Sequence, residues 1–246
     1  MNDIIEVFKN LKTTRKTEFN NDHIEEELVD KIKDCILRTS NASNRQSYSI
    51  IELDREQIKE LGFRGDRVLI YCVDFYRLKL CAEELEQDFN SEYFMQFVTG
   101  LIDISLLVQS TVLAAQSLGI DTLVTNEVYH KKIDRLFNTL KLPKFFVFPM
   151  IAVCMGYTNK SKTVKGRLNK DNIIFRGTYK SFTKKDIKGI IEEVDDKKKR
   201  IGLIDTWDDK GYEHYYEWFF DKWSKSIGNE QESVELVNEL RKHKMI

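Results

Sequence analysis

Apolar residues recur at helical spacing in two segments near the N-terminus. In residues 3–12 they stand three and four positions apart, which is the pattern of a helix with one buried stripe. A second helix is expected over residues 22–39, with Asp22 as its N-terminal cap. A stretch dense in Ser and Asn follows it, and such side chains compete for backbone hydrogen bonds. The sequence therefore predicts a loop after the second helix.

Short apolar runs rich in β-branched and aromatic residues predict strands. These runs cover residues 48–53, 67–75, 120–124 and 145–154. Helical patterns lie between them, over residues 54–61, 78–85, 93–118 and 130–140. Because helices alternate with strands, the pattern indicates an α/β or α+β fold.

The segment 93–118 is apolar around most of its circumference. Such a helix must be covered on all sides, either by its own domain or by a second subunit. Its part from Leu101 to Leu118 is about as long as a membrane span. However, it contains Asp103, Gln109 and Gln116, and we therefore interpret it as a buried helix of a soluble protein with no membrane partner.

Beyond about residue 180 the chain becomes more polar. Three segments, 184–200, 207–223 and 232–244, have the pattern of helices joined by short linkers. They contain too few apolar residues to bury a core of their own, so we expect them to wrap around the main domain or its partner. The expected division is a main domain over 1–180 and a helical C-terminal extension over 181–246.

Composition narrows the possible partners and the compartment. The 39 Lys and Arg residues nearly balance 40 Asp and Glu residues among 246, so no global field favours nucleic acid or anionic lipid. The N-terminus lacks the basic start and apolar run of a signal peptide. The scattered cysteines indicate reduced thiols and a cytoplasmic protein; they are Cys35, Cys72, Cys81 and Cys154.

The turn Lys12-Thr13-Thr14-Arg15 follows the first helix. Two cations and two hydroxyls within four residues offer several donors to one phosphate dianion. The alternative is a solvated helix C-terminus, where the helix dipole favours cations.

Two further polar segments could border a ligand. The loop Ser40–Gln46 offers small side chains and amides, which suit the edge of a flat heteroaromatic ring, although an ordinary polar loop has the same composition. Lys165-Gly166-Arg167 supplies two more cations, and an exposed charge run is the alternative there. No zinc-ligand spacing, phosphate-binding loop, Rossmann fingerprint or nucleophile elbow is present.

The order of these segments resembles the nitroreductase family over roughly residues 3–180. The family's N-terminal motif, typically Arg-Arg-Ser/Thr-x-Arg-x-Phe, resembles residues 11–17. Its Pro-Ser-x-x-Asn-x-Gln-Pro-Trp loop resembles residues 40–48. The further similarities are Asp103, Ala114-Ala115-Gln116-Ser117-Leu118-Gly119, Leu142-Pro143, Gly156-Tyr157 and Lys165-Gly166-Arg167. The tail after residue 180 has no counterpart in the family's common core.

The resemblance implies a nitroreductase-like α+β fold of the three-layer type. It has a central, mostly antiparallel sheet flanked by helices, with a helical C-terminal extension here. It also implies bound FMN. Residues implied to hold the phosphate and ribityl end are Lys12, Thr13, Arg15, Lys165 and Arg167. Residues implied to border the ring, some from the opposite subunit, are Asn41, Ala42, Asn44 and Gln46, and backbone contacts beside the reactive ring nitrogen are expected from Thr125 and Asn126.

The chain departs from the family pattern in the basic turn and in the ring-bordering loop. Leu11 stands where the family usually has its first Arg, and Thr17 replaces an aromatic residue. The phosphate contacts then depend more on Arg167, or the motif is shifted by one residue toward Lys16. In the loop, Ser47-Tyr48 replaces Pro-Trp.

The resulting functional expectation is hydride transfer from NADH or NADPH to FMN and reduction of a small organic acceptor, such as a nitroaromatic or quinone, by a homodimer. No protein acid or base is required by this scheme, so no catalytic side chain and no metal are expected. The alternatives are other flavin chemistry on the same fold, such as reductive dehalogenation or dehydrogenation, and a flavin-binding protein without nicotinamide turnover. A purely structural protein is the rival outside flavin biochemistry.

Overall fold

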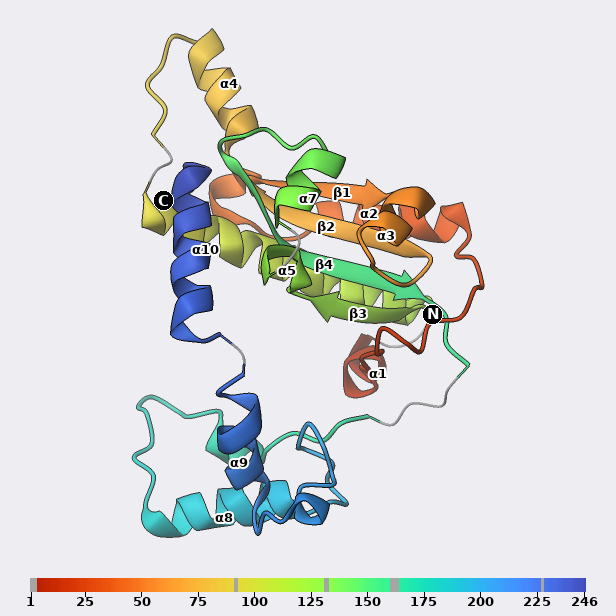
Figure 1. Ribbon diagram of the computed structural model, residues 1–246, viewed down its shortest axis with the longest axis vertical. Helices are drawn as coiled ribbons and strands as arrows, with labels where there is room; N and C mark the ends of the chain where they lie inside the picture. Colours follow the sequence, from red (N-terminus) through yellow and green to blue (C-terminus); the bar gives the residue numbers. More distant parts are fainter. Residues whose placement is uncertain (1–3, 91–92, 131–132, 160–163, 227) are drawn as a thin grey trace. The chain divides into compact units, whose positions relative to one another are not determined.

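The apolar runs of the sequence form one antiparallel sheet in the computed structural model. Its strands lie in the order β1-β2-β4-β3 (Figure 1). Each neighbouring pair is antiparallel, which confirms the expected central antiparallel sheet and the α+β class. The strands are β1 (Tyr48–Leu53), β2 (Arg67–Asp74), β3 (Asp121–Thr125) and β4 (Val147–Gly156).

The structure describes residues 4–90, 93–130, 133–159, 164–226 and 228–246. The chain divides into two units. The first unit, which contains the sheet, comprises Met1–Lys162 and Val234–Ile246, and the second comprises Thr163–Ser233.

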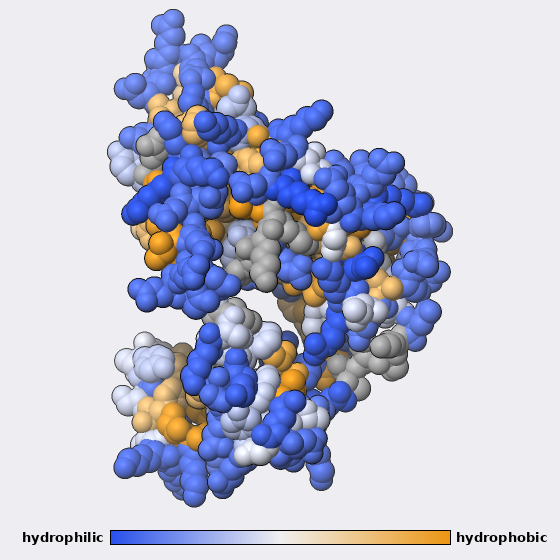
Figure 2. Space-filling view, viewed as in Figure 1, coloured by the Kyte–Doolittle hydropathy of each residue, from blue (hydrophilic) through white to orange (hydrophobic). Residues whose placement is uncertain are grey.

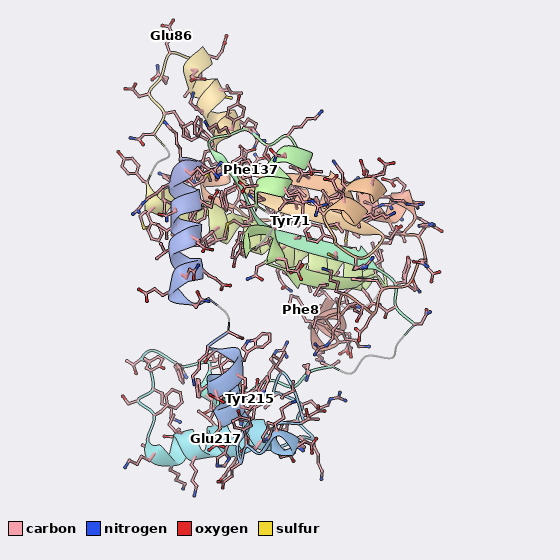
Figure 3. The ribbon with its side chains drawn as sticks, in the orientation of Figure 1. Phe8, Tyr71, Glu86, Phe137, Tyr215 and Glu217 are labelled. Atoms are coloured by element: carbon pink, nitrogen blue, oxygen red, sulfur yellow. The ribbon has the colours of Figure 1, made fainter. Side chains whose placement is uncertain are left out.

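Strand β2 lies between β1 and β4, and its side chains fill the core on both faces of the sheet. Leu69, Tyr71 and Val73 belong to the apolar cluster on one face, and the alternate residues 68, 70 and 72 belong to the cluster on the other. This is the two-residue period of a strand buried on both sides. Figure 3 shows Tyr71 among these strands.

A proline interrupts the ladder between β2 and β4. Pro149 has no N–H to donate, so it is tolerated inside a sheet only at an edge or an irregularity. The pairing shifts at this point, because Tyr71 faces Ile151 whereas the next residue, Cys72, faces Pro149. Met150 is the extra residue of the resulting β-bulge.

Helices cover both faces of the sheet (Figure 1). The face with Tyr71 is covered by α2 (Glu26–Leu37) and α5 (Phe94–Ser117). The opposite face is covered by α3 (Arg55–Glu60), α6 (Glu127–His130) and α7 (Ile133–Thr139). One helix was expected over 130–140; the structure has α6 and α7 there, and residues 131–132 lie outside the described part.

Local side-chain chemistry sets several helix ends. Asp54 caps α3 by accepting from the Gln57 N–H at 2.8 Å. Gly119, with φ +76°, follows the end of α5 in the left-handed conformation that glycine adopts without strain. The expected Asp22 cap is wrong, because α2 begins at Glu26 and the Asp22 carboxylate instead accepts from the Asn20 amide at 2.7 Å.

By length and composition α5 could cross a membrane. In the structure it packs along the sheet and α2, with Asp103 only 2% exposed. Tyr71 joins β2 to α5 through a hydrogen bond between its hydroxyl and that of Thr111. Part of the opposite side of α5 is uncovered within one chain.

Two helices of the first unit bury little or nothing. In α1 (Ile4–Lys9) Val7 is the one buried residue, and α4 (Tyr76–Glu84) has none. Apolar atoms reach the surface along α4 (Figure 2), where Leu80 is 45% exposed. The sequence periodicity thus predicted α4 but not its weak packing.

The C-terminal helix α10 (Glu230–Lys242) leads back to the first unit. Leu240 and Met245 are buried in the core cluster on the α5 face. The Phe146 N–H donates to the His243 carbonyl oxygen at 2.9 Å, and the His243 ring stacks on Phe137 of α7 with centroids 3.9 Å apart.

The second unit has a small apolar core. Its elements include α8 (Lys184–Asp195), α9 (Tyr215–Trp218), the 3-10 turns η2 (Lys170–Asn172) and η3 (Asp208–Lys210), and the π-helical turn η4 (Phe219–Trp223). The core consists of Val194, Trp207, Tyr215 and Trp218. The expectation that the tail buries no core of its own is therefore wrong.

Candidate functional site

The basic turn predicted at Lys12–Arg15 lies against the edge of the sheet. The Thr14 N–H donates to the Thr122 carbonyl of β3 at 2.9 Å, and Thr14 is 1% exposed. The Lys12 N–H donates to Gln116 Oε1 at 3.4 Å. Two long-range backbone contacts therefore fix the course of this turn, and Thr13 is exposed between them.

The cations of the turn differ in their availability. The Lys16 ammonium lies 3.3 Å from a Glu127 carboxylate oxygen. The Arg15 side chain is exposed, and its guanidinium forms no hydrogen bond or ion pair among the described residues. Lys12 lines a cavity of about 250 Å³ beside α1 and the end of α5. Arg15 is thus the cation of this turn most available to an anion.

Thr125 and Asn126 lie where β3 ends. The Thr125 hydroxyl accepts from the Glu127 N–H at 3.2 Å, and the Asn126 amide donates to the Tyr129 hydroxyl at 2.8 Å. Because Lys16 pairs with Glu127, this segment lies beside the basic turn. The structure therefore brings together two of the predicted stretches.

The predicted ring-bordering loop has a strained backbone. Ser43, Asn44 and Gln46 have φ values of 55°, 50° and 54°, in the left-handed region that side-chain-bearing residues seldom adopt. The Asn41 side chain bridges the loop by accepting from the Gln46 N–H at 3.1 Å. Strain of this kind persists where surrounding contacts impose it and is concentrated at functional sites.

Three side chains outside the loop impose its conformation. Asp103 accepts from the Ala42 N–H at 2.9 Å, Gln96 accepts from the Arg45 guanidinium, and Arg77 donates to the Gln46 carbonyl at 2.6 Å. No sequence pattern indicated a role for Gln96 or Arg77, and Asp103 stood out only through the family resemblance. The sequence indicated only weakly that these residues hold the loop, because single polar residues on apolar helices are common.

The buried carboxylate of Asp103 also affects the phenol of Tyr48, which follows the loop. Burial first, and then the negative charge of Asp103, raise the pKa of Tyr48, whereas Arg77 acts in the opposite direction. Tyr48, at the start of β1, is therefore close enough to the Asp103 carboxylate for the charge of Asp103 to shift the Tyr48 pKa.

Within one chain, the loop and the basic turn contact α5 far apart. The loop meets α5 at Asp103 and the turn meets it at Gln116. At the 1.5 Å rise of an α-helix, these positions are separated by about 20 Å. The described part of one chain therefore does not bring these two stretches together.

Lys165 and Arg167 belong to the second unit. The Lys165 ammonium donates to the Gly202 carbonyl at 2.8 Å, and Arg167 donates to the Gly166 carbonyl at 2.8 Å. A Cβ at Gly166 would lie 2.0 Å from the Lys199 carbonyl oxygen, so only glycine fits there. Convergence of these two cations with the residues of the first unit stays a prediction.

No family model matches the chain, but individual known proteins are similar to it. The FMN reductase (NADPH) of Bacillus subtilis (strain 168) is 26% identical over 191 residues, which cover 73% of this chain and 75% of the relative. The solved NfrA1 nitroreductase of B. subtilis superposes with a TM-score of 0.76 at 22% identity, covering 95% of this chain and 98% of its own. The chain therefore has the nitroreductase fold, and its sequence is similar to that of an FMN reductase (NADPH).

A second solved structure is similar to this chain over nearly its whole length. The NADPH:FMN oxidoreductase of Vibrio harveyi, solved with NAD+, has a TM-score of 0.78 and 19% identity over 99% of this chain and 98% of its own. The tail after residue 180, which matched nothing in the sequence motifs, thus has a counterpart in a nitroreductase-fold structure.

Proposed function

We propose that this protein is an FMN-dependent oxidoreductase of the nitroreductase type that takes a hydride from NADH or NADPH and passes it to a small organic acceptor, such as a nitroaromatic or a quinone. The observation that carries the proposal is the fixed basic turn beside β3, with the Arg15 guanidinium unpaired within the described residues. The FMN reductase named among its relatives supports the same cofactor and donor.

The chemistry of the turn fits a phosphate group. A guanidinium offers a rigid fork of donors that matches phosphate oxygens, and an ammonium adds a point charge. We assign this role to Arg15, with Lys12 and Thr13 beside it. Lys165 and Arg167 would add contacts from the second unit.

The loop fits the edge of a heteroaromatic ring. Asn44 and Gln46 are exposed, and their amides can both donate and accept, while the small Ala42 leaves room for close approach. Asn41 keeps the loop closed through its bond to Gln46. Thr125 and Asn126 would offer backbone groups beside the ring from the end of β3.

When bound, FMN supplies the hydride chemistry, and the protein supplies position and charge. The site residues of this chain would orient the ring and exclude water from one side of it. We assign no catalytic acid or base.

The homodimer is part of the proposal. Ile102 and Leu106, one turn apart on α5, are 55% and 44% exposed, and a second copy would cover them. Because the loop and the turn contact α5 about 20 Å apart, a two-fold arrangement would let the loop of one copy approach the turn of the other. We place the enzyme in the cytoplasm, with no nucleic-acid or membrane partner, from its free cysteines and balanced charge.

The proposal is tested with the purified full-length protein. FMN uptake is measured by equilibrium dialysis, and oxidation of NADH and NADPH is followed with a panel of nitroaromatics, quinones and halophenols. We expect one FMN per chain and turnover with at least one acceptor. FMN uptake without nicotinamide oxidation would instead indicate a flavin-binding protein, and turnover restricted to halophenols would indicate reductive dehalogenation. Failure to take up FMN would reject the proposed function.

A further inference from the structure

Three of the polar residues of the mostly apolar helix α5 form a line along it. Gln96, Asp103 and Ser110 are spaced seven positions apart, so they lie two turns from one another on nearly the same helix face. Each accepts a hydrogen bond from the segment 39–45: from the Arg45 guanidinium, the Ala42 N–H and the Thr39 hydroxyl, respectively. We call these three residues the polar seam.

The central residue of the seam is the most buried. Asp103 is 2% exposed, and its single hydrogen bond within the described residues is the one from Ala42 at 2.9 Å; its other oxygen is buried without a partner there. A buried carboxylate that accepts from only one neutral donor destabilises the folded protein, because desolvation of the charge costs free energy. An apolar side chain at this position would stabilise the core more than Asp103 does. We therefore infer that Asp103 has a role other than packing.

The contact made by Asp103 lies at the start of the strained loop. Ala42 is followed by Ser43 and Asn44, both left-handed. The backbone can remain in this conformation only if its contacts outweigh the local cost of about 1–3 kcal/mol per strained residue. The bond from Ala42 to Asp103 fixes the residue from which the strained turn departs.

We propose that Asp103 is a positioning residue of the flavin site: it holds the loop 41–46 in the conformation that receives the ring, while Gln96 and Ser110 hold the ends of the segment. This inference rests on the proposed function. Asp103 acts through Ala42 and is not itself a catalytic residue.

The test compares Asp103→Ala and Asp103→Asn with Asp54→Ala as the matched control. The Asp54 carboxylate also accepts a backbone N–H in the first unit, at 2.8 Å, but it caps α3 away from the loop. FMN dissociation constants are measured on the apoproteins by flavin fluorescence, together with thermal midpoints. Hydrogen exchange of the peptide 40–47 in the FMN-free proteins gives a readout that does not need the cofactor.

We expect Asp103→Ala to weaken FMN binding about tenfold or more, as for a lost buried hydrogen bond, and to speed exchange in the peptide 40–47. Asp103→Asn keeps an acceptor for the Ala42 N–H and should remain within about threefold of the parent. Asp54→Ala should lower the thermal midpoint and leave FMN binding unchanged.

Unchanged FMN binding and unchanged exchange in Asp103→Ala would overturn the inference, as would equal losses in the Ala and Asn variants or the same loss in Asp54→Ala. If Asp103→Ala does not fold, the double variant Gln96→Ala, Ser110→Ala replaces it, and parent-like binding in that variant would overturn the inference. If the parent protein binds no FMN, the proposed function fails, whereas the exchange measurement still reports whether Asp103 holds the loop.

Discussion

The Thr14 N–H donates to the Thr122 carbonyl oxygen across 2.9 Å, and this bond ties the turn after α1 to the edge strand β3. The turn is therefore part of the sheet's framework and not a free helix end. The ion pair between Lys16 and Glu127 fixes its far side. Arg15 lies between these two attachments with its guanidinium exposed, which singles it out as the residue to test first.

Replacement of Arg15 by Ala should weaken binding of FMN much more than binding of riboflavin, which lacks the phosphate. A charge-assisted hydrogen bond contributes about 1.5–3 kcal/mol, so the FMN dissociation constant should rise about tenfold or more. Fluorescence titration of the apoprotein with each flavin measures both constants.

Lys16→Ala and Lys9→Ala are the comparison variants for Arg15. Lys16 is already paired with Glu127, and Lys9 pairs with Glu6 on α1, so both should change FMN binding less than Arg15→Ala. A larger effect at Lys16 than at Arg15 would show that the phosphate motif is shifted by one residue.

Substitution of Ile102 by Lys should break the proposed dimer. Ile102 is 55% exposed on α5, and a charge buried without a partner in an apolar interface costs several kcal/mol. Light scattering coupled to size-exclusion chromatography should give a dimer for the parent and a monomer for the variant. Val234→Lys, at a residue 53% exposed on α10, should remain dimeric. A monomeric parent protein would contradict this part of the account.

His214 should make the stability of the second unit depend on pH. Its Nδ1 lies 2.7 Å from Asp195 Oδ2, and this hydrogen bond is the main cause that raises the pKa of His214. Because the folded-state pKa is the higher one, the stabilisation is fully present below the unfolded-state pKa of about 6.5 and is lost as the pH rises through the folded-state value.

The urea midpoint reports this effect through tryptophan fluorescence, since all three tryptophans lie in the second unit; they are Trp207, Trp218 and Trp223. The difference between parent and His214→Asn should be largest at acidic pH and shrink as the pH rises. A difference that does not vary with pH would disprove the titration of His214 as its cause.

Gly65→Ala should destabilise the sheet. Gly65 has φ +104°, and a Cβ there would lie 2.6 Å from the Met155 carbonyl oxygen. We expect a loss of about 2 kcal/mol or more from the free energy of unfolding. Gly119→Ala separates the two causes, because φ is +76° there and, apart from its chain neighbours, no described residue has an atom within 4 Å of the added Cβ. Thermal unfolding, followed by circular dichroism, should give a lower midpoint for Gly65→Ala than for Gly119→Ala. Equal decreases in the midpoint would exclude the steric clash as the cause.

The spacing of apolar residues along the chain was sufficient to predict the strands and the long helix. The run Tyr48–Leu53 coincides with β1, and the segment 93–118 differs from α5 by one residue at each end. These elements depend on the spacing of apolar residues, which the sequence displays directly. The cap at Asp22 could not be decided in this way, because Asn20 competes for the same carboxylate.

The small core of the second unit could not be predicted from the sequence for a different reason. Trp207, Tyr215 and Trp218 come from a turn and a very short helix, so no regular period reveals that they share an interior. For α10, the sequence led to the expectation that the segment 232–244 packs on the main domain or on its partner, but the helical pattern does not say that Leu240 and Met245 enter the core.

For the candidate site, the sequence identified types of residue but not their attachments. The resemblance drew attention to the loop 40–48, whereas the bond that holds it joins Ala42 to Asp103, 61 positions away. Nothing local distinguishes Asp103 from any other polar residue on a core helix. The roles of Lys165 and Arg167 stay predictions.

The most direct test of the central claim is anaerobic titration of the FMN-loaded protein with NADH and with NADPH, followed by flavin absorbance in the visible range. We expect at least one of the two nicotinamides to bleach the flavin, and the colour to recover when a nitroaromatic or quinone is added. A protein that remains colourless after incubation with FMN, or whose bound flavin neither nicotinamide bleaches, would contradict the claim.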